Sequence, residues 1–157
     1  MFVVDASASV GAENYPKQLE FVKSLTEKFN LTETGTRAAF VSYTIGDGDS
    51  ITEFGFQTDI ESFNEKVDEI VYADGFTLTG AAIEHAYIDI IRKEARPDAA
   101  VSIIVLTDGF SFDDVKTPSD LLRSVQIEMF AIGVKNYSAF KNLGPTTSIW
   151  SFLRFLE

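Results

Sequence analysis

The sequence predicts an α/β fold with a doubly wound, mostly parallel central sheet, helices on both faces and one antiparallel strand at the sheet edge. Three observations support this prediction. Short apolar runs alternate with segments of helical periodicity, which is typical of a parallel sheet covered by helices. The segment Val101–Leu106 is almost continuously apolar, as in a strand buried on both faces. A short glycine-containing turn joins two strand-like segments, which predicts a hairpin and therefore the antiparallel strand.

The first half of the chain is predicted to form a strand, a helix and this hairpin. Phe2-Val3-Val4 is the first strand, and apolar residues recur at helical spacing from Tyr15 to Asn30. Segments 37–45 and 51–56 flank the turn Gly46-Asp47-Gly48-Asp49-Ser50. The aspartate spacing in this turn resembles a calcium loop, but the downstream glutamate of an EF-hand is missing, so a plain hairpin turn is favoured.

The second half continues the alternation. The expected elements are a helix from Ile60 to Val71, a helix including Ile83 to Ile91, a strand at Val101–Leu106, a short helix through Val125 capped by Thr117-Pro118, and a strand from Glu128 to Val134. The segment 136–157 is harder to interpret: 149–152 is compatible with a last strand, and 153–157 with the beginning of a helix.

Length and composition indicate a single domain over residues 1–157. A chain of 157 residues with 45% hydrophobic residues can fill one core, and no linker or repeat divides it. No apolar run approaches the length of a membrane span, so direct membrane insertion is not expected. Because the chain begins inside its first predicted strand, without a signal peptide, we expect a piece excised from a larger protein.

Charge and cysteine content narrow the class of partner. A net charge of −11 and a pI near 4.5 argue against nucleic acid and anionic membranes, which bind basic surfaces. The absence of cysteine says only that no disulfide holds the domain. Asn30-Leu31-Thr32 and Asn136-Tyr137-Ser138 are possible glycosylation sites and permit a secreted protein.

Oxygen-bearing side chains gather in three segments that could form a metal site. Asp5, Ser7 and Ser9 alternate directly after the first strand, where they can converge on one point. Thr77 lies in the glycine-flanked loop Gly75–Gly80 that leads into a predicted helix, and Asp108 follows the apolar strand. Oxygen ligands suit Mg²⁺, Mn²⁺ or Ca²⁺ better than zinc or copper.

These three segments, in this order, resemble the von Willebrand factor A family, also called the integrin inserted-domain family, over nearly the whole chain. The resemblance implies a metal-ion-dependent adhesion site with the ligand set Asp5, Ser7, Ser9, Thr77 and Asp108. In the family the two serines would ligate directly, the threonine directly or through water, and the two aspartates largely through water. Thr79 is the alternative threonine, but Thr77 better fits the family's spacing to the following helix.

The resemblance also implies a mechanism, in which an Asp or Glu of a partner protein takes the open coordination position. Two aspartates about 6 Å apart would repel by about 2 to 3 kcal/mol, and a divalent cation removes this repulsion. The hydroxyls add no charge, so the ion stays electrophilic enough to accept an outside carboxylate. We therefore expect an extracellular or cell-surface adhesion module, with extracellular matrix proteins among the candidate partners.

Alternatives remain open for several of these residues. Asp5 could cap the next helix or form an Asx-turn, Asp113 could be a rim residue or part of a solvated turn, and Phe76 could be a rim contact or a core residue. His85, which has no second histidine or cysteine to join it, is expected on a helix surface.

Other function classes are also considered. An intracellular assembly module of the same fold, with or without a working metal site, is the main alternative. Catalysis is not expected. Haloacid-dehalogenase-like phosphatases need a second aspartate where Ser7 stands, and response-regulator receivers need an acidic pair and a lysine that are not in place.

Overall fold

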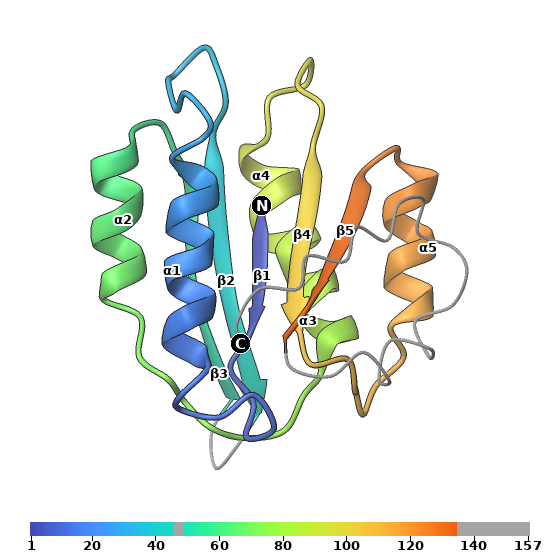
Figure 1. The fold of residues 1–157 in the computed structure, drawn as a ribbon. Helices are drawn as coiled ribbons and strands as arrows, with labels where there is room; N and C mark the ends of the chain where they lie inside the picture. Colours follow the sequence, from blue (N-terminus) through green and yellow to red (C-terminus); the bar gives the residue numbers. More distant parts are fainter. Residues whose placement is uncertain (46–48, 135–157) are drawn as a thin grey trace.

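The computed structural model describes residues 1–45 and 49–134, which contain a five-stranded sheet in the order β3-β2-β1-β4-β5 (Figure 1). The strands are β1 Phe2–Asp5, β2 Ala38–Ile45, β3 Asp49–Gln57, β4 Ser102–Thr107 and β5 Glu128–Gly133. β1 pairs in parallel with both β2 and β4, and β4 in parallel with β5. Among the described strands, only β3, at the edge, is antiparallel to its neighbour. The predicted sheet type and edge hairpin are therefore confirmed.

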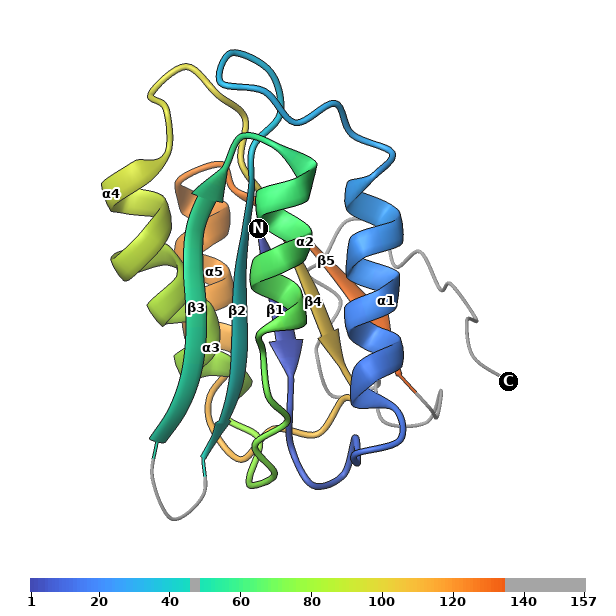
Figure 2. The same ribbon diagram turned by 90° about the vertical axis from the view of Figure 1, so that its left-hand side faces the viewer.

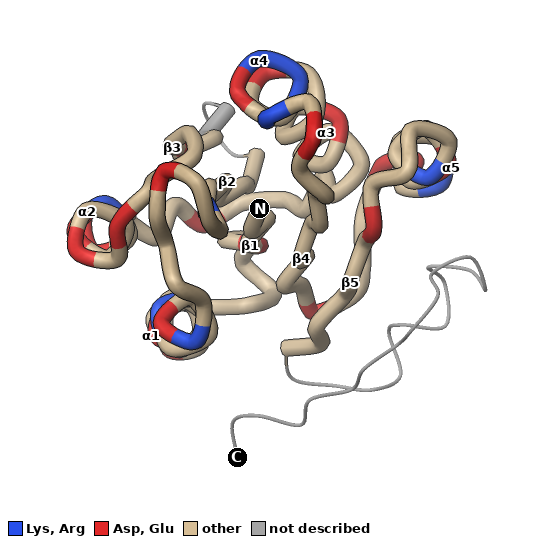
Figure 3. The backbone as a smooth tube through the Cα atoms, turned by 90° about the horizontal axis from the view of Figure 1, so that it is seen from above, with Lys and Arg blue, Asp and Glu red and all other residues tan. Residues whose placement is uncertain are grey.

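Helices cover both faces of the sheet, as predicted (Figures 2 and 3). One face carries α1 (Tyr15–Thr26) and α2 (Ile60–Asp68). The other carries α5 (Lys116–Ser124) and a long helix built from three consecutive parts. These parts are α3 Thr79–His85, the π-helical η1 Ala86–Ile91 and α4 Arg92–Glu94.

The core consists of two layers, one on each side of the sheet. Successive side chains of a strand point to opposite faces, so Phe2 and Val4 pack in one layer and Val3 in the other. Phe63 of α2 belongs to the first layer and Ile83 of α3 to the second. Burial on both sides explains why β1 and β4 are apolar at nearly every position.

Two predicted helix ends were wrong. The first helix ends at Thr26 instead of Asn30, since residues 27–29 form a turn. The second ends at Asp68 instead of Val71. Ile70, which continues the apolar pattern, is buried in the core from a non-helical segment, while Val71 is exposed. An apolar side chain can therefore match helical spacing without being in a helix.

The predicted start of the helix that precedes β5 was also wrong. α5 begins at Lys116, and the carboxylate of Asp114 accepts hydrogen bonds from the backbone N–H groups of Lys116 (2.8 Å) and Thr117 (3.3 Å). Asp114 thus satisfies amide groups that have no partner within the helix, which is the role expected of Thr117-Pro118.

Some expectations lie outside the described residues. These are the tip of the hairpin turn at 46–48, the second glycosylation site at Asn136, and the last strand and helix expected within 136–157. Within the described ranges, none of the helices has the length and apolar character needed to cross a membrane.

Candidate metal centre

The three segments with candidate metal ligands meet at one edge of the sheet, the lower edge in Figure 1. β1 and β4 are parallel neighbours, with Val4 opposite Leu106, so Asp5 ends one strand and Asp108 directly follows the end of its neighbour. The segment leading into α3 is attached to the end of β2 by reciprocal backbone hydrogen bonds between Ile45 and Phe76. Ligand sites in open α/β sheets lie at this edge, beyond the carboxyl ends of the strands.

Asp5 is fully buried at the end of β1 and is held by two hydrogen bonds. Its Oδ1 accepts from the Ser7 backbone N–H at 2.9 Å, and its Oδ2 accepts from the Thr107 hydroxyl at 2.7 Å. The first bond is the Asx-turn considered from the sequence. Burial raises the pKa of Asp5, the hydrogen bonds oppose this rise, and the negative charge of Asp108 adds to it. The two carboxylates are thus close enough to repel each other.

The two serines lie side by side in the turn after Asp5. The Oγ atoms of Ser7 and Ser9 are 3.1 Å apart, with Ser7 buried and Ser9 exposed. The backbone N–H of Ala8 donates to the Gly75 carbonyl at 2.8 Å, which joins this turn to the segment containing Thr77. The two serine hydroxyls are therefore adjacent, in a turn whose backbone is bonded to Asp5 and to Gly75.

Thr77 is buried, and its carbonyl accepts from the Phe112 backbone N–H at 3.0 Å, which joins the second segment to the third. The Thr79 hydroxyl is hydrogen-bonded to the Tyr43 hydroxyl at 2.8 Å, inside the core. Thr79 thus already has a packing role. This observation favours Thr77, the residue chosen from the sequence, as the candidate ligand.

Glycine is required at position 75, two residues before Thr77. Gly75 has a φ of 156°, and a Cβ at this position would lie 2.4 Å from the Ile45 carbonyl oxygen. Any side chain would therefore push the Thr77 segment away from the end of β2.

Asp108 carries a buried carboxylate oxygen that lacks a partner. Its Oδ1 accepts no hydrogen bond from any residue the structure describes. A buried polar atom without a partner is costly, and more so when it belongs to a charged group. Because Asp5 lies near enough to repel Asp108, a cation between them would relieve both unfavourable effects.

The donor set consists of two carboxylates and several hydroxyls. In ranges 1–45 and 49–134, no group of three or more His, Cys, Asp or Glu residues is placed to hold a metal. A cation at this edge would therefore depend on the neutral hydroxyls. Oxygen donors of this kind fit a hard divalent cation.

Asp113, expected at the rim, has both carboxylate oxygens engaged with its own surroundings. It accepts from the backbone N–H groups of Gly80 (3.1 Å) and Ala81 (2.7 Å) in the first turn of α3, and from the Ser111 hydroxyl at 2.6 Å. A Cβ on Gly80 would lie 2.2 Å from the Asp114 carbonyl oxygen. Asp113 thus fastens the loop after β4 to the start of α3, and its contact with a partner stays a prediction.

Three residues near the site were missed from the sequence: Ser111, Phe110 and Phe112. Thr107, which binds Asp5, belongs to the segment Thr107-Asp108-Gly109 that the sequence indicates, but its own role was not predicted. The two phenylalanines stand in the loop after Asp108. Phe76, whose role was left open, is 64% exposed and so is not a core residue.

His85 and Asn30 lie away from the candidate metal ligands. His85 is on the surface of α3, where it contacts Glu53 of β3 and has its Nδ1 3.2 Å from a carboxylate oxygen of Asp89. It is a helix-surface residue, as expected. Asn30 is exposed in the connection after α1, where a glycan would have room, and its modification remains a prediction.

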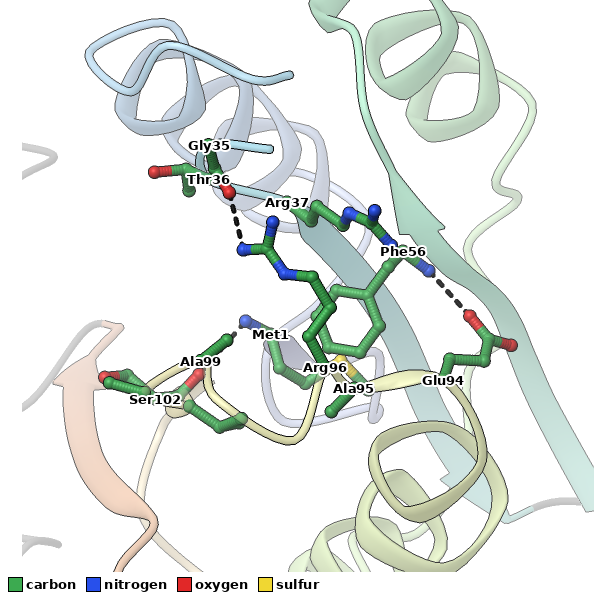
Figure 4. Close-up of a pocket in the computed structure, with 12 residues that line it drawn as sticks. Met1, Gly35, Thr36, Arg37, Phe56, Glu94, Ala95, Arg96, Ala99 and Ser102 are labelled. Atoms are coloured by element: carbon green, nitrogen blue, oxygen red, sulfur yellow. Dashed lines mark hydrogen bonds between the residues drawn. The ribbon is translucent and has the colours of Figure 1, made fainter. Parts of the chain in front are cut away.

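A cavity of 260 Å³ lies near the beginnings of β1 and β4, at the opposite edge of the sheet (Figure 4). Arg37 and Arg96 line it, but both bind the connection before β2. Arg96 donates to the carbonyls of Glu33 (3.0 Å) and Gly35 (2.7 Å), and Arg37 to that of Glu33. These guanidinium groups hold a loop in place and lie far from the candidate metal ligands.

Comparison with curated proteins gives relatives from the matrix and the cell surface. The chain is 34% identical to mouse vitrin over 139 residues, 85% of this chain and 20% of vitrin. It is 33% identical to the mouse collagen alpha-1(XX) chain, over 87% of this chain and 10% of the collagen chain. It is 32% identical to the transmembrane cell adhesion receptor mua-3 of Caenorhabditis elegans, over 98% of this chain and 4% of the receptor.

Solved structures show the same fold. Proximal thread matrix protein 1 from the mussel byssus, with a zinc-occupied MIDAS motif, superposes with a TM-score of 0.74 at 29% identity, covering 86% of this chain and 35% of that one. Manganese-loaded TRAP protein of Plasmodium vivax gives a TM-score of 0.79 at 19% identity, covering 97% of this chain and 66% of that one.

The chain spans about a fifth or less of the three curated relatives named above. These relatives are matrix and adhesion proteins, and the expected extracellular or cell-surface location is confirmed. Residues 1–146 match the family model of the von Willebrand factor type A domain. Together with the sheet order and the relatives at more than 30% identity, this match shows that the chain belongs to the von Willebrand factor type A domain family.

Proposed function

We propose that this domain is a metal-dependent protein-binding module, in which a divalent cation at the edge of the sheet accepts an Asp or Glu side chain from a partner protein. The observation that carries the proposal is the buried Asp108 Oδ1, which lacks a partner among the described residues and lies near a second buried carboxylate, Asp5. A protein keeps such an arrangement at a cost in stability, which a bound cation offsets.

The chain's own residues would hold the cation in distinct ways. Ser7, Ser9 and Thr77 supply neutral oxygens, and the carboxylates of Asp5 and Asp108 supply the charge. Bound there, a divalent cation provides Lewis acidity toward an incoming carboxylate. Asp5 also orders the serine turn, through the hydrogen bond from its Oδ1 to the Ser7 N–H.

The charge of this donor set explains why a partner carboxylate would bind. Two ionised aspartates balance a divalent cation, and the hydroxyls add oxygen atoms without adding charge. The five candidate ligands themselves then add no excess negative charge that would oppose one more carboxylate at the cation. Four carboxylates around the cation would give the site a net negative charge, and it would not attract a partner carboxylate.

Mg²⁺ is the proposed physiological cation, with Mn²⁺ equally suited by size and Ca²⁺ also compatible, because all the candidate donors are oxygens. The relatives support a divalent cation. The mussel byssus protein has zinc in its MIDAS motif, and the Plasmodium protein is manganese-loaded.

The relatives also support the class of function. Matrix and adhesion proteins dominate the comparison, so we infer a non-catalytic recognition domain that is part of a larger extracellular or cell-surface protein, with matrix proteins as candidate partners. An intracellular assembly role is disfavoured by the same relatives. We further propose that the exposed Asn30 is available for glycosylation.

Calorimetric titration of chelator-stripped protein with Mg²⁺ and with Mn²⁺ tests the site. We expect saturable binding to the wild type, strong loss of binding in Ser7→Ala, and unchanged binding in Ser24→Ala, a matched control at an exposed position of α1. Equal binding by the wild type and Ser7→Ala would remove the assigned site. An absence of metal binding in all three proteins would favour a metal-independent scaffold.

A further inference from the structure

Three exposed phenylalanines form a patch beside the candidate metal centre. Phe76, Phe110 and Phe112 are 64%, 53% and 62% exposed. Phe112 lies at the middle of the patch: its ring centroid is 5.6 Å from that of Phe76 and 4.7 Å from that of Phe110, both in edge-to-face geometry. Single exposed apolar residues are ordinary, but three rings joined through Phe112 make a continuous apolar surface of the kind used for binding.

This patch, Phe76–Phe110–Phe112, is carried by a backbone that is firmly held. Phe76 exchanges two backbone hydrogen bonds with Ile45 at the end of β2, and the Phe112 N–H donates to the Thr77 carbonyl. The loop between Phe110 and Phe112 is fastened further, since Ser111 donates to Asp113 and accepts from the Thr79 N–H. The rings are therefore presented at little further entropic cost, as in preorganised binding surfaces.

The same residues connect the patch to the metal centre. Phe76 directly precedes Thr77, and Phe110 stands two residues after Asp108. A segment whose carboxylate reached these candidate ligands would bring its neighbouring side chains over the patch. The patch and the metal centre are thus parts of one surface, at the carboxyl edge of the sheet.

The charged residues within the loops that build the site are all acidic, and the first basic residue after the last of these loops is Lys116, beside Asp114. The loops that build the site, residues 5–14, 72–80 and 108–115, contain no Lys or Arg. They contain six acidic residues: Asp5, Glu13, Asp74, Asp108, Asp113 and Asp114. Asp74 and Asp114 are exposed. A divalent cation leaves these loops net negative, in a chain whose net charge is already −11. A partner segment that offered only a carboxylate would be repelled as it approached.

We propose that the partner segment carries a basic side chain, best an arginine, within a few residues of the Asp or Glu that binds the cation, and that this side chain lies over the patch Phe76–Phe110–Phe112. A cation is attracted by the faces of aromatic rings and by the exposed carboxylate of Asp74, next to Gly75 and Phe76. Arginine also stacks on flat rings and is less strongly hydrated than lysine. The inference rests on the proposed function, because the carboxylate sets where the segment lies.

The test is a selection from a displayed library of random peptides that share one fixed glutamate, performed on the Mg²⁺-loaded domain with release by chelator. We expect enrichment of Arg, and less strongly Lys, near the glutamate on the wild type. Phe112→Ser should lose this preference. Phe29→Ser, at another exposed phenylalanine located after α1, should keep it. Melting curves confirm that each variant is folded.

A double-mutant cycle then measures the contact. One selected peptide and its Arg→Ala form are titrated against the wild type and Phe112→Ser. We expect Phe112→Ser to weaken the arginine peptide about two- to fivefold, the effect of one exposed cation–π contact, and to change the alanine peptide much less. Equal effects on the two peptides would overturn the inference.

The outcomes separate the two proposals. Metal-dependent enrichment without a basic preference, or the same preference on Phe112→Ser, would contradict the role of the patch and leave the metal-dependent function standing. Peptide binding that chelator does not release, or no enrichment at all, would contradict both. Enrichment of apolar neighbours in place of basic ones would assign the patch to a different partner chemistry, and so would also overturn the inference.

Discussion

The Thr107 hydroxyl donates a 2.7 Å hydrogen bond to Oδ2 of Asp5, from the last residue of β4 to the last residue of β1. The same Oγ atom accepts a bond from the Gly109 N–H at 3.1 Å. One hydroxyl therefore orients the buried carboxylate and also holds the turn that contains Asp108. Residues that hydrogen-bond to a metal ligand and orient it commonly have a large effect on metal affinity.

Thr107→Val, which removes the hydroxyl and keeps the shape, should weaken Mg²⁺ binding about 10- to 100-fold. It should also lower the free energy of unfolding by about 1.5 to 3 kcal/mol, because a buried hydrogen bond to a carboxylate is lost. Thr107→Ser retains the hydroxyl and should restore most of the metal affinity. Calorimetry and denaturant unfolding measure the two effects. Unaltered affinity in Thr107→Val would show that the Thr107–Asp5 hydrogen bond does not affect metal binding.

Asp108→Ala should abolish metal-dependent partner binding while the metal-free protein becomes as stable as the wild type or more so. The physical reason is that the variant removes a buried oxygen without a partner and its repulsion with Asp5. Melting temperatures without and with Mg²⁺ measure the stability of the metal-free protein and its gain on binding metal. Asp98→Ala, at an exposed position, is the control. A variant that still gains stability from Mg²⁺ would contradict the assignment.

The stability of the metal-free domain should depend on the ionisation of Asp5. Burial raises its pKa above the ordinary value of 3.8, so the folded protein keeps this proton to a higher pH than the unfolded chain does. The stabilising contribution of the protonated group is therefore complete below pH 3.8 and is lost as the pH rises through the raised pKa. Asp5→Asn should remove this part of the pH dependence.

The affinity for Mg²⁺ should increase as the pH rises and Asp5 loses its proton. Because a cation must displace the Asp5 proton, the gain in melting temperature on adding Mg²⁺ should increase over the pH range in which that proton is lost. The measurement is the difference in melting temperature with and without Mg²⁺, at a series of pH values, for the wild type and Asp5→Asn. A gain that does not vary with pH would show that Asp5 is already ionised without metal.

Asp113→Ala should lower the free energy of unfolding by about 0.5 to 2 kcal/mol, the usual effect of losing a carboxylate that binds the amides at the start of a helix. Its effect on Mg²⁺ affinity should be small, since both oxygens of Asp113 are engaged with α3 and Ser111. Denaturant unfolding and calorimetry test the two statements. A loss of metal affinity as large as that of Ser7→Ala would place Asp113 among the ligands.

Gly80→Ala tests the same connection by a steric route. An added methyl group would meet the Asp114 carbonyl oxygen at 2.2 Å, so the loop after β4 would have to move away from α3. We expect a lower melting temperature and weaker metal binding, because that loop also contains Asp108. Ala81→Gly, at the neighbouring exposed position, should cost only about 1 kcal/mol through helix propensity. Equal effects of the two changes would argue against the steric explanation.

Local patterns in the sequence were sufficient for the sheet type and the position of most elements. The apolar runs of β1 and β4 and the hairpin between β2 and β3 were predicted, since burial on both faces and turn composition leave a direct trace in neighbouring residues. Helix ends were less accurate. Ile70 continues the apolar period past the end of α2 because it packs in the core from a turn. The π-helical turns of Ala86–Ile91 left no recognised signal.

The sequence by itself determined the fold family and the five candidate ligands, because their spacing within each segment is local. The tertiary structure alone decided that β1 and β4 are neighbours, that Thr107 binds Asp5, and that one oxygen of Asp108 is buried without a partner among the described residues. It also decided that three phenylalanines meet beside the site. The strand pairing, the Thr107–Asp5 bond and the contact of Phe76 with Phe112 join residues that are far apart in the chain. Such contacts depend on how strands and loops pack, and no short window of sequence encodes that packing.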